Sequence, residues 1–325
     1  MRRLSSSTAN RGRHAAIAVA LLTASACVPA PTEVTRSTTS TTTVADASRA
    51  SAARLWETEY LPSVGVASQW TGSVASCASG SVSAAYQAAV LRRINFFRAM
   101  AGLPAVQLDA AYSAKAGEAA LMVAANNALS HDPPASWLCY TAVGAEGAGH
   151  SNLALGVSGP EAIDGYMQDG GTTNSAVGHR RWLLHPPATR MGLGDIPDQA
   201  NALWVLDGGA GTPRAVIPRD GYVAWPPKGY VPKSMVFQRW SFALDGADLT
   251  GAKISLTRNG KACSVTVVHR DRPPGVYGDP AVVWEVGASC GPGTGGDVTY
   301  RVTVAGVVVN AVTRSYSYTV TAFTP

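Results

Sequence analysis

The stretch RINFFRAMAGLPAVQLD, residues 93–109, holds the end of one helix and the beginning of the next. Apolar residues recur at helical spacing from about Ala84 into this stretch, which predicts an amphipathic helix that the Gly and Pro of AGLPA bring to an end. Asp109 then stands where a helix N-cap is expected. The Ala-rich sequence after it predicts a long second helix that reaches about Leu129.

Two shorter helices are expected further along the chain. Ser158 and Glu161 have the spacing of a capping box, which predicts a third helix up to about Gln168. Asn174 or Ser175 is expected to cap a short helix through AVGHRRWLL. The segments TRMGLGDI and ANALWVLDGG that follow are typical of strands.

The pattern changes after a Pro-rich connection, PRDGYVAWPPKGYVP, which interrupts both helices and central strands. Beyond it apolar and polar residues alternate, and Asn259-Gly260 suits the two-residue turn of a hairpin. Several short strands at this spacing predict an antiparallel, immunoglobulin-like β-sandwich of about 100 residues. We therefore expect two domains, 54–210 and 211–325, with Trp225 and Tyr230 as candidates to pack them together.

The N-terminus predicts export from the cell. Residues 1–26 contain four arginines, the short apolar run AAIAVALLTASA and small residues before Cys27, in the order of a cleavable signal peptide. Either ordinary signal peptidase cuts there, or the site is a bacterial lipobox and Cys27 carries a lipid, although Ala24 stands where that motif usually has leucine. Residues 27–53 are rich in Ser and Thr and are expected to form a disordered tether.

The cysteines fit a protein of the cell surface or the extracellular space. Their number is five, and setting Cys27 aside as the lipidated residue leaves an even set for an oxidising compartment. Of the three possible pairings, one keeps each bridge inside an expected domain. We therefore predict that Cys77 pairs with Cys139 and that Cys263 pairs with Cys290.

The net charge of +5 does not indicate nucleic-acid binding. Four of the 26 basic residues lie in the signal segment, which leaves 22 basic against 21 acidic residues and a net charge of about +1. The remaining Arg and Lys residues form no cluster of the kind that binds phosphates. Nucleic acid is therefore not an expected partner.

A family resemblance appears when the motifs are taken in order. The succession RINFFRAMAGLPAVQLD, LSH, SNLALG, GYMQD, GHRRWLLHP and MGLGD resembles the CAP superfamily, which comprises the cysteine-rich secretory, antigen 5 and pathogenesis-related-1 proteins and is also called the SCP domain. The resemblance covers roughly Ala84 to Leu206. It implies an α+β protein, with a CAP-type α-β-α sandwich followed by the antiparallel immunoglobulin-like β-sandwich.

The resemblance also implies a central cleft lined by two histidines and two acidic residues, where some members of the family bind a divalent metal. The histidines correspond to His131 and His179. One acid normally opens a Glu-Asn dipeptide, and Ser151-Asn152 occupies that place, while the other acid falls on Asp169. His131, His179 and Asp169 would form only a weak zinc site, since a catalytic zinc takes three protein ligands.

Three functions remain open at this point. The first is a non-enzymatic extracellular protein, anchored in the membrane through Cys27, whose cleft or loops bind a lipid, a cell-envelope glycan or a protein. The second is an extracellular hydrolase, in which a metal on His131 and His179 activates water and Asp169 is a third ligand or a general base. The third is an adhesion module formed by the C-terminal sandwich. Serine at position 151, in place of the acid, favours the first.

Overall fold

The computed structural model describes residues 47–207 and 218–325 of the chain, and these belong to one compact unit. The expected signal sequence, Cys27, most of the expected tether and the expected domain boundary at 210/211 lie outside these ranges. None of the helices in the described ranges has the length and apolar character needed to cross a membrane.

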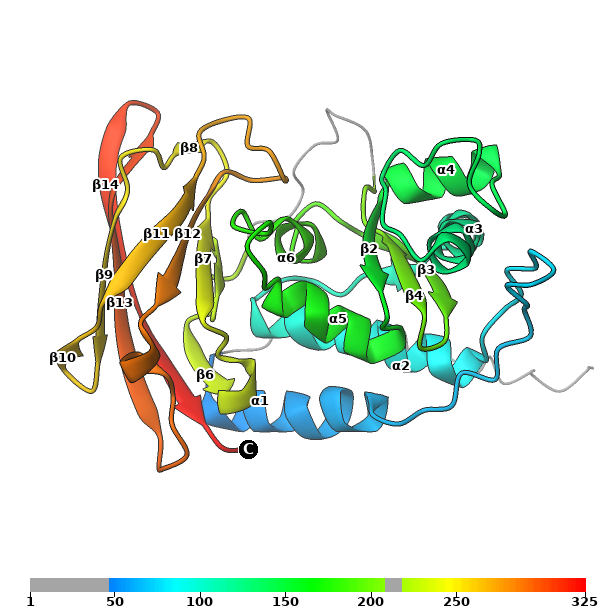
Figure 1. Ribbon diagram of the computed structural model, residues 1–325. Helices are drawn as coiled ribbons and strands as arrows, with labels where there is room; N and C mark the ends of the chain where they lie inside the picture. Colours follow the sequence, from blue (N-terminus) through cyan, green and yellow to red (C-terminus); the bar gives the residue numbers. More distant parts are fainter. Residues whose placement is uncertain (1–46, 208–217) are drawn as a thin grey trace, which may run out of the picture. The chain divides into compact units, whose positions relative to one another are not determined.

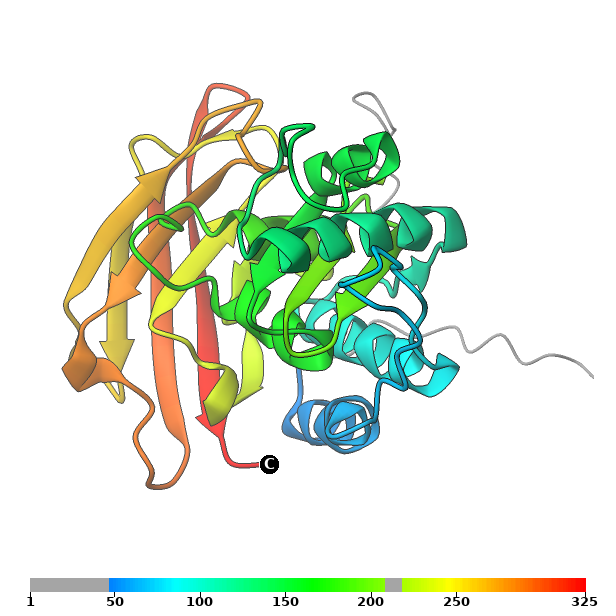
Figure 2. The same ribbon diagram turned by 45° about the vertical axis from the view of Figure 1, so that its right-hand side comes forward.

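A four-stranded sheet forms the centre of the first half, with helices on both faces (Figures 1 and 2). Its strand order is β1-β3-β4-β2, formed by β1 (Gln107–Leu108), β2 (Ser151–Leu155), β3 (Arg190–Ile196) and β4 (Ala200–Trp204). One face is covered by α3 (Ala110–Asn126) and α4 (Ala142–Gly149), and the other by α2 (Ala84–Met100) and α5 (Gly159–Gln168). The expected α-β-α sandwich is confirmed.

The alternation of side chains along the strands explains the two covered faces. On β4, Leu203 joins the apolar cluster of α2 and α5, whereas Ala202 and Trp204 join the cluster of α3. Successive side chains of a strand point to opposite faces, so the sheet needs an apolar cover on each. The resulting two cores hold β2 and the helix ends in fixed positions around the site described below.

The first two long helices begin where the sequence predicts. Asp109 caps α3, because its Oδ1 accepts hydrogen bonds from the backbone N–H groups of Ala111 and Tyr112 at 2.9 and 3.0 Å. The helix ends at Asn126, three residues before the expected Leu129. Asn127 stops it by adopting the left-handed conformation at φ 46°, which asparagine tolerates better than most residues.

Two expected helix caps are wrong, although the helices themselves exist. Ser158 precedes α5, but its hydroxyl accepts from the backbone N–H of Asp198 instead of capping the helix. Helix α6 (Gly178–Leu183) begins after Val177, which has a φ of 47°, so neither Asn174 nor Ser175 caps it. A long-range contact takes the hydroxyl of Ser158, whereas the side-chain amide of Asn174 donates to the carbonyl oxygen of Gly170.

The end of the expected tether is helical and packed. Helix α1 (Arg49–Leu55) continues into a π-helical turn (Trp56–Tyr60) and a short 3-10 turn (Leu61–Ser63). Ser48 caps α1, Leu55 is buried, and the Tyr60 ring lies 5.1 Å from that of Phe96. The expectation of disorder up to residue 53 is therefore wrong for its last residues, because apolar surface just after them gives the helix a partner.

The C-terminal half is a β-sandwich, as expected. One sheet has the order β10-β9-β13-β14-β6 with β8 beside β13, and the other has the order β11-β12-β7-β5. The strands are β5 (Val223–Trp225), β6 (Gly229–Pro232), β7 (Arg239–Ala243), β8 (Ala247–Asp248), β9 (Lys253–Arg258), β10 (Lys261–Ala262), β11 (Val265–Arg270), β12 (Ala281–Val286), β13 (Val298–Val309) and β14 (Val312–Phe323). The pairs are antiparallel except that β6 runs parallel to β14. Asn259 and Gly260 make the expected turn between β9 and β10 with φ of 47° and 81°.

Both predicted disulfides are present. Cys77 is bonded to Cys139 beside α3, and Cys263 is bonded to Cys290 within the sandwich. Each bridge therefore lies inside one half of the molecule and none joins the two halves within the described chain.

The two halves share one hydrophobic core. A single cluster of buried residues extends from Leu55 in α1 to Phe323 in β14. Trp225 is fully buried in it, and its ring lies 5.3 Å from that of Phe97 on α2. Trp225 thus packs the two halves together. Tyr230 packs against Phe323 of the sandwich and also contacts α1, since the Arg49 guanidinium lies 5.8 Å from the centroid of its ring.

Candidate functional site

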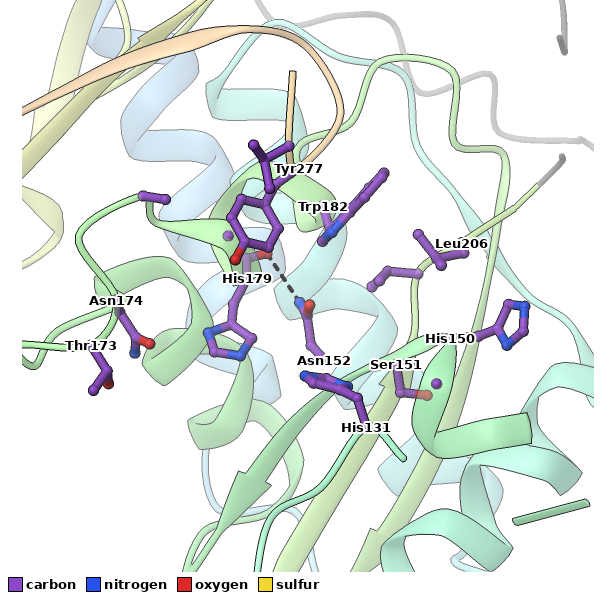
Figure 3. Close-up of a pocket in the computed structure, with 15 residues that line it drawn as sticks. His131, His150, Ser151, Asn152, Thr173, Asn174, His179, Trp182, Leu206 and Tyr277 are labelled. Carbon is purple, nitrogen blue, oxygen red and sulfur yellow. Dashed lines mark hydrogen bonds between the residues drawn. The ribbon is translucent and has the colours of Figure 1, made fainter. Parts of the chain in front are cut away.

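A cavity of about 380 Å³ opens between the first residues of β2, helix α6 and a loop of the sandwich. Figure 3 shows the rings of His131 and His179 beside the same cavity, with the amide of Asn152 between them in that view. The lining consists of His131, Gly149, His150, Ser151, Asn152, Thr173, Asn174, Ala176, Gly178, His179, Trp182, Val205, Leu206, Val276 and Tyr277.

His179 is oriented by a buried carboxylate. Its Nδ1 lies 2.9 Å from Oδ1 of Asp169, whose side chain is completely buried, and Oδ2 of Asp169 accepts from the backbone N–H of Arg180 at 3.3 Å. A carboxylate accepts hydrogen bonds, so Nδ1 of His179 carries a proton. Its Nε2 makes no hydrogen bond to the residues that the structure describes.

His131 is held in a similar way by a backbone carbonyl. Its Nδ1 lies 2.9 Å from the carbonyl oxygen of Ala148, at the end of α4. A carbonyl oxygen can only accept, so Nδ1 of this ring also carries the proton. Each histidine therefore keeps Nε2 free of described partners, and in the neutral ring this atom is a hydrogen-bond acceptor for a ligand.

Asn152 and Tyr166 support the His179 side of the cavity. The side-chain amide of Asn152 donates to the carbonyl oxygen of His179 at 3.0 Å (Figure 3). The Tyr166 ring lies 5.4 Å from that of His179, and its hydroxyl donates to Oδ1 of Asn201 at 2.7 Å. Burial raises the pKa of Tyr166 well above its usual value, so this phenol remains a neutral donor.

Ser151 brings an unsatisfied hydroxyl to the cavity. The residue is 5% exposed, and its Oγ has no hydrogen-bond partner among the described residues. It makes no hydrogen bond to either histidine, so neither imidazole is placed to activate this hydroxyl as a nucleophile. A buried hydroxyl without a partner costs free energy unless a bound molecule satisfies it.

The loop of residues 169–177 is fixed from the sandwich. The guanidinium Nη1 of Arg239, on β7, donates to the carbonyl oxygens of Asp169, Gly171 and Asn174 at 2.9 to 3.1 Å. Glu285 pairs with the same guanidinium at 2.6 Å. The sandwich thus holds the backbone that carries the carboxylate partner of His179.

Arg180, on α6, reaches from the helical half into the sandwich, whereas Arg239 reaches from the sandwich into the helical half. The buried guanidinium of Arg180 donates to the carbonyl oxygens of Met167, Gln168 and Arg239 and to the hydroxyl of Ser241. Burial lowers its pKa to about 10, which leaves it charged at neutral pH. The residue that follows His179 in the sequence therefore anchors α6 to β7.

The structure brings together four of the five expected cleft residues. His131, Ser151, Asn152 and His179 line the cavity, whereas Asp169 lies behind His179 and does not. Sequence reasoning missed the remaining wall, formed by Thr173, Asn174, Trp182 and the sandwich residues Val276 and Tyr277. No local signal could have found Tyr277, because the loop that carries it is distant in the sequence and expected in another domain.

The residues of the cavity do not fit a catalytic metal. Asp169, the expected third ligand, is engaged with Nδ1 of His179, and the described chain contains no group of three His, Cys, Asp or Glu side chains arranged to hold an ion. His131 and His179 fall short of the three protein ligands that a catalytic zinc requires, and the third histidine of the lining, His150, is stacked on Trp204 and bonded to the carbonyl oxygen of Glu146. We therefore derive no metal-dependent step.

Comparison with known families agrees with the fold and the position of the site. Residues 91–207 match the model of CAP, the Cysteine-rich secretory protein family. This segment begins in α2 and ends just beyond β4, and it includes His131 and His179. The chain therefore contains a CAP domain, as the motifs predicted. No curated protein matches the chain.

Proposed function

We propose that this protein is a non-enzymatic extracellular binding protein whose CAP cavity takes up a small ligand. One observation carries the proposal: both histidines bind protein acceptors through Nδ1 and leave Nε2 free of described partners beside the same cavity. The unsatisfied hydroxyl of Ser151 adds a third group for a ligand to satisfy. A preformed cavity with a few polar groups among apolar side chains is the usual form of a small-molecule site.

The experiment is a ligand capture with the full chain. The protein is incubated with an extract of cell-envelope glycans, lipids and peptides, washed, and analysed by mass spectrometry. We expect one class of molecule to be retained, and retention to fall at least tenfold in His131→Ala and in His179→Ala. Leu138→Ala is the control, because Leu138 is exposed and lies outside the cavity lining. Equal retention by all four proteins would reject the proposal.

Export and lipid anchoring belong to the same proposal. The two disulfides support an oxidising compartment. The anchor rests on the sequence around Cys27, which lies outside the described residues. Replacing Cys27 with Ser is expected to release the protein from the membrane fraction into the medium, and a variant that stays with the membrane would refute the anchor.

A further inference from the structure

The sandwich supplies one wall of the CAP cavity. Residues 271–280 connect β11 to β12, and two of them, Val276 and Tyr277, line the cavity together with the histidines. Val276 is 65% exposed and Tyr277 is 37% exposed, so both side chains are accessible to a ligand. In Figure 3 the Tyr277 ring stands at the cavity beside His179 and Trp182.

This loop is fixed to the helix that carries His179. The buried guanidinium of Arg181 pairs with the carboxylate of Asp271 and donates to the carbonyl oxygen of Asp279 at 2.8 Å. His269 lies 2.8 Å from the other oxygen of Asp271. The two ends of the loop are therefore tied to α6, and the Tyr277 side chain between them has a defined position.

Glycine at position 178 allows the Tyr277 ring to lie close to the backbone of α6. A Cβ at Gly178 would stand 3.0 to 3.2 Å from three carbon atoms of the Tyr277 ring. The Arg181 guanidinium lies 5.5 Å from the centroid of the same ring. The ring is thus supported by the backbone of α6 on one side while more than a third of its surface stays accessible to a ligand.

The chemistry of the cavity lining selects the class of ligand. His131 and His179 offer two imidazole nitrogens, and Ser151, Asn152, Thr173 and Asn174 add hydroxyl and amide groups. Trp182 and Tyr277 present aromatic rings to the same cavity. An acyl chain would leave the buried hydroxyl of Ser151 unsatisfied, which costs free energy. A sugar ring matches both kinds of group, because its hydroxyls can bind the polar groups and its C–H face can pack on an aromatic ring.

We propose that the cavity binds a neutral saccharide of one or two pyranose rings, and that Tyr277, supplied by the sandwich, is the ring on which the sugar stacks. This inference rests on the proposed binding function and names its ligand. It also gives the sandwich a direct part in recognition, so that the CAP segment alone would lack one wall of the site.

The test uses the full chain and three soluble probes, cellobiose, maltose and the disaccharide of N-acetylglucosamine, with palmitate as the lipid comparison. Binding is measured by calorimetry, and saturation-transfer NMR follows contact between the sugar C–H protons and aromatic rings. We expect at least one saccharide to bind. Tyr277→Ala should weaken its binding about tenfold or more and abolish the aromatic transfer, whereas Tyr277→Phe should stay within about threefold, because stacking uses the ring.

Val312→Ala is the matched control, since Val312 is also an exposed apolar residue of the sandwich but lies outside the cavity lining. Unfolding midpoints of all variants show whether any loss of binding comes from misfolding. The inference is overturned if no saccharide binds or if Tyr277→Ala binds like the unaltered chain. Palmitate binding that His179→Ala abolishes, with no saccharide binding, would overturn the inference and leave the proposed binding function standing. Absence of any ligand, in this test and in the capture, would overturn both.

Discussion

At the scale of single residues, the buried carboxyl group of Asp195 has a strongly raised pKa. Asp195, on β3, is 6% exposed, and its Oδ1 accepts from the backbone N–H of Gly159 and from the side-chain amide of Asn201. Its Oδ2 is buried without a hydrogen-bond partner in the described chain. Burial raises the pKa of Asp195 to about 7. The folded protein therefore favours the protonated acid.

This shift predicts a stability that depends on pH. The folded pKa lies above the unfolded value of about 3.8, so the contribution of Asp195 is fully present below about pH 4 and is lost as pH rises to about 7. The loss amounts to about 1.4 kcal/mol per pH unit in that window. Asp195→Asn removes the titration while keeping an oxygen acceptor, so we expect the variant to gain stability over the unaltered chain as pH rises from 5 to 8.

Urea unfolding at four pH values across this range measures the effect. Asp132→Asn serves as the control, because Asp132 is exposed. If the stability curves of Asp195→Asn and the unaltered chain run parallel from pH 5 to pH 8, the assignment of the titrating group to Asp195 is wrong.

At the scale of elements, the packing of α3 against β3 depends on two glycines. A Cβ at Gly194 would lie 2.1 Å from the carbonyl carbon and oxygen of Ala116 in α3, and one at Gly192 would lie 2.4 Å from the backbone of Tyr112. These contacts involve backbone atoms, which cannot rotate away as a side chain can. The two glycines of the motif MGLGD thus allow helix α3 and strand β3 to approach closely.

Gly194→Ala is therefore expected to destabilise the protein by about 1 to 3 kcal/mol, the usual cost of overpacking. Gly165→Ala is the paired change, since Gly165 is exposed in α5 and a Cβ there would meet nothing within 4 Å. It should stabilise the protein by about 0.5 to 1 kcal/mol through helix propensity. Chemical denaturation of both variants gives the comparison, and equal stabilities would contradict the packing argument.

At the scale of the whole molecule, the helical half and the sandwich depend on each other. One apolar cluster contains residues of both halves, and charged side chains cross between them in both directions, Arg180 toward β7 and Arg239 toward the 169–177 loop. Neither guanidinium keeps these acceptors if the halves separate. The two expected domains thus form one compact unit in the described chain.

We accordingly expect a single unfolding transition for the whole chain. Far-UV circular dichroism follows the helices, and near-UV signals follow the buried tryptophans Trp225, Trp240 and Trp284. The two curves should coincide in midpoint and width during thermal unfolding. Transitions that separate by several degrees would show that the halves unfold independently despite the shared core.

The sequence by itself determined the elements whose causes are local. Helix α3 begins at Asp109 because a carboxylate there can cap the helix, and the β9–β10 turn forms because Asn259 and Gly260 tolerate positive φ. The order of short motifs was enough to place the CAP domain and its two histidines. The even number of remaining cysteines, together with the two expected domains, was enough to predict both disulfides.

Only the tertiary structure decided the features that need distant partners. Ser158 loses its expected capping role because its hydroxyl accepts from the backbone N–H of Asp198, which is far away in the sequence. Asp169 orients His179 instead of facing the cavity, which depends on the left-handed backbone at the end of α5. Tyr277 reaches the CAP cavity because the two halves share a core, and no periodicity or motif near residue 277 carries that information.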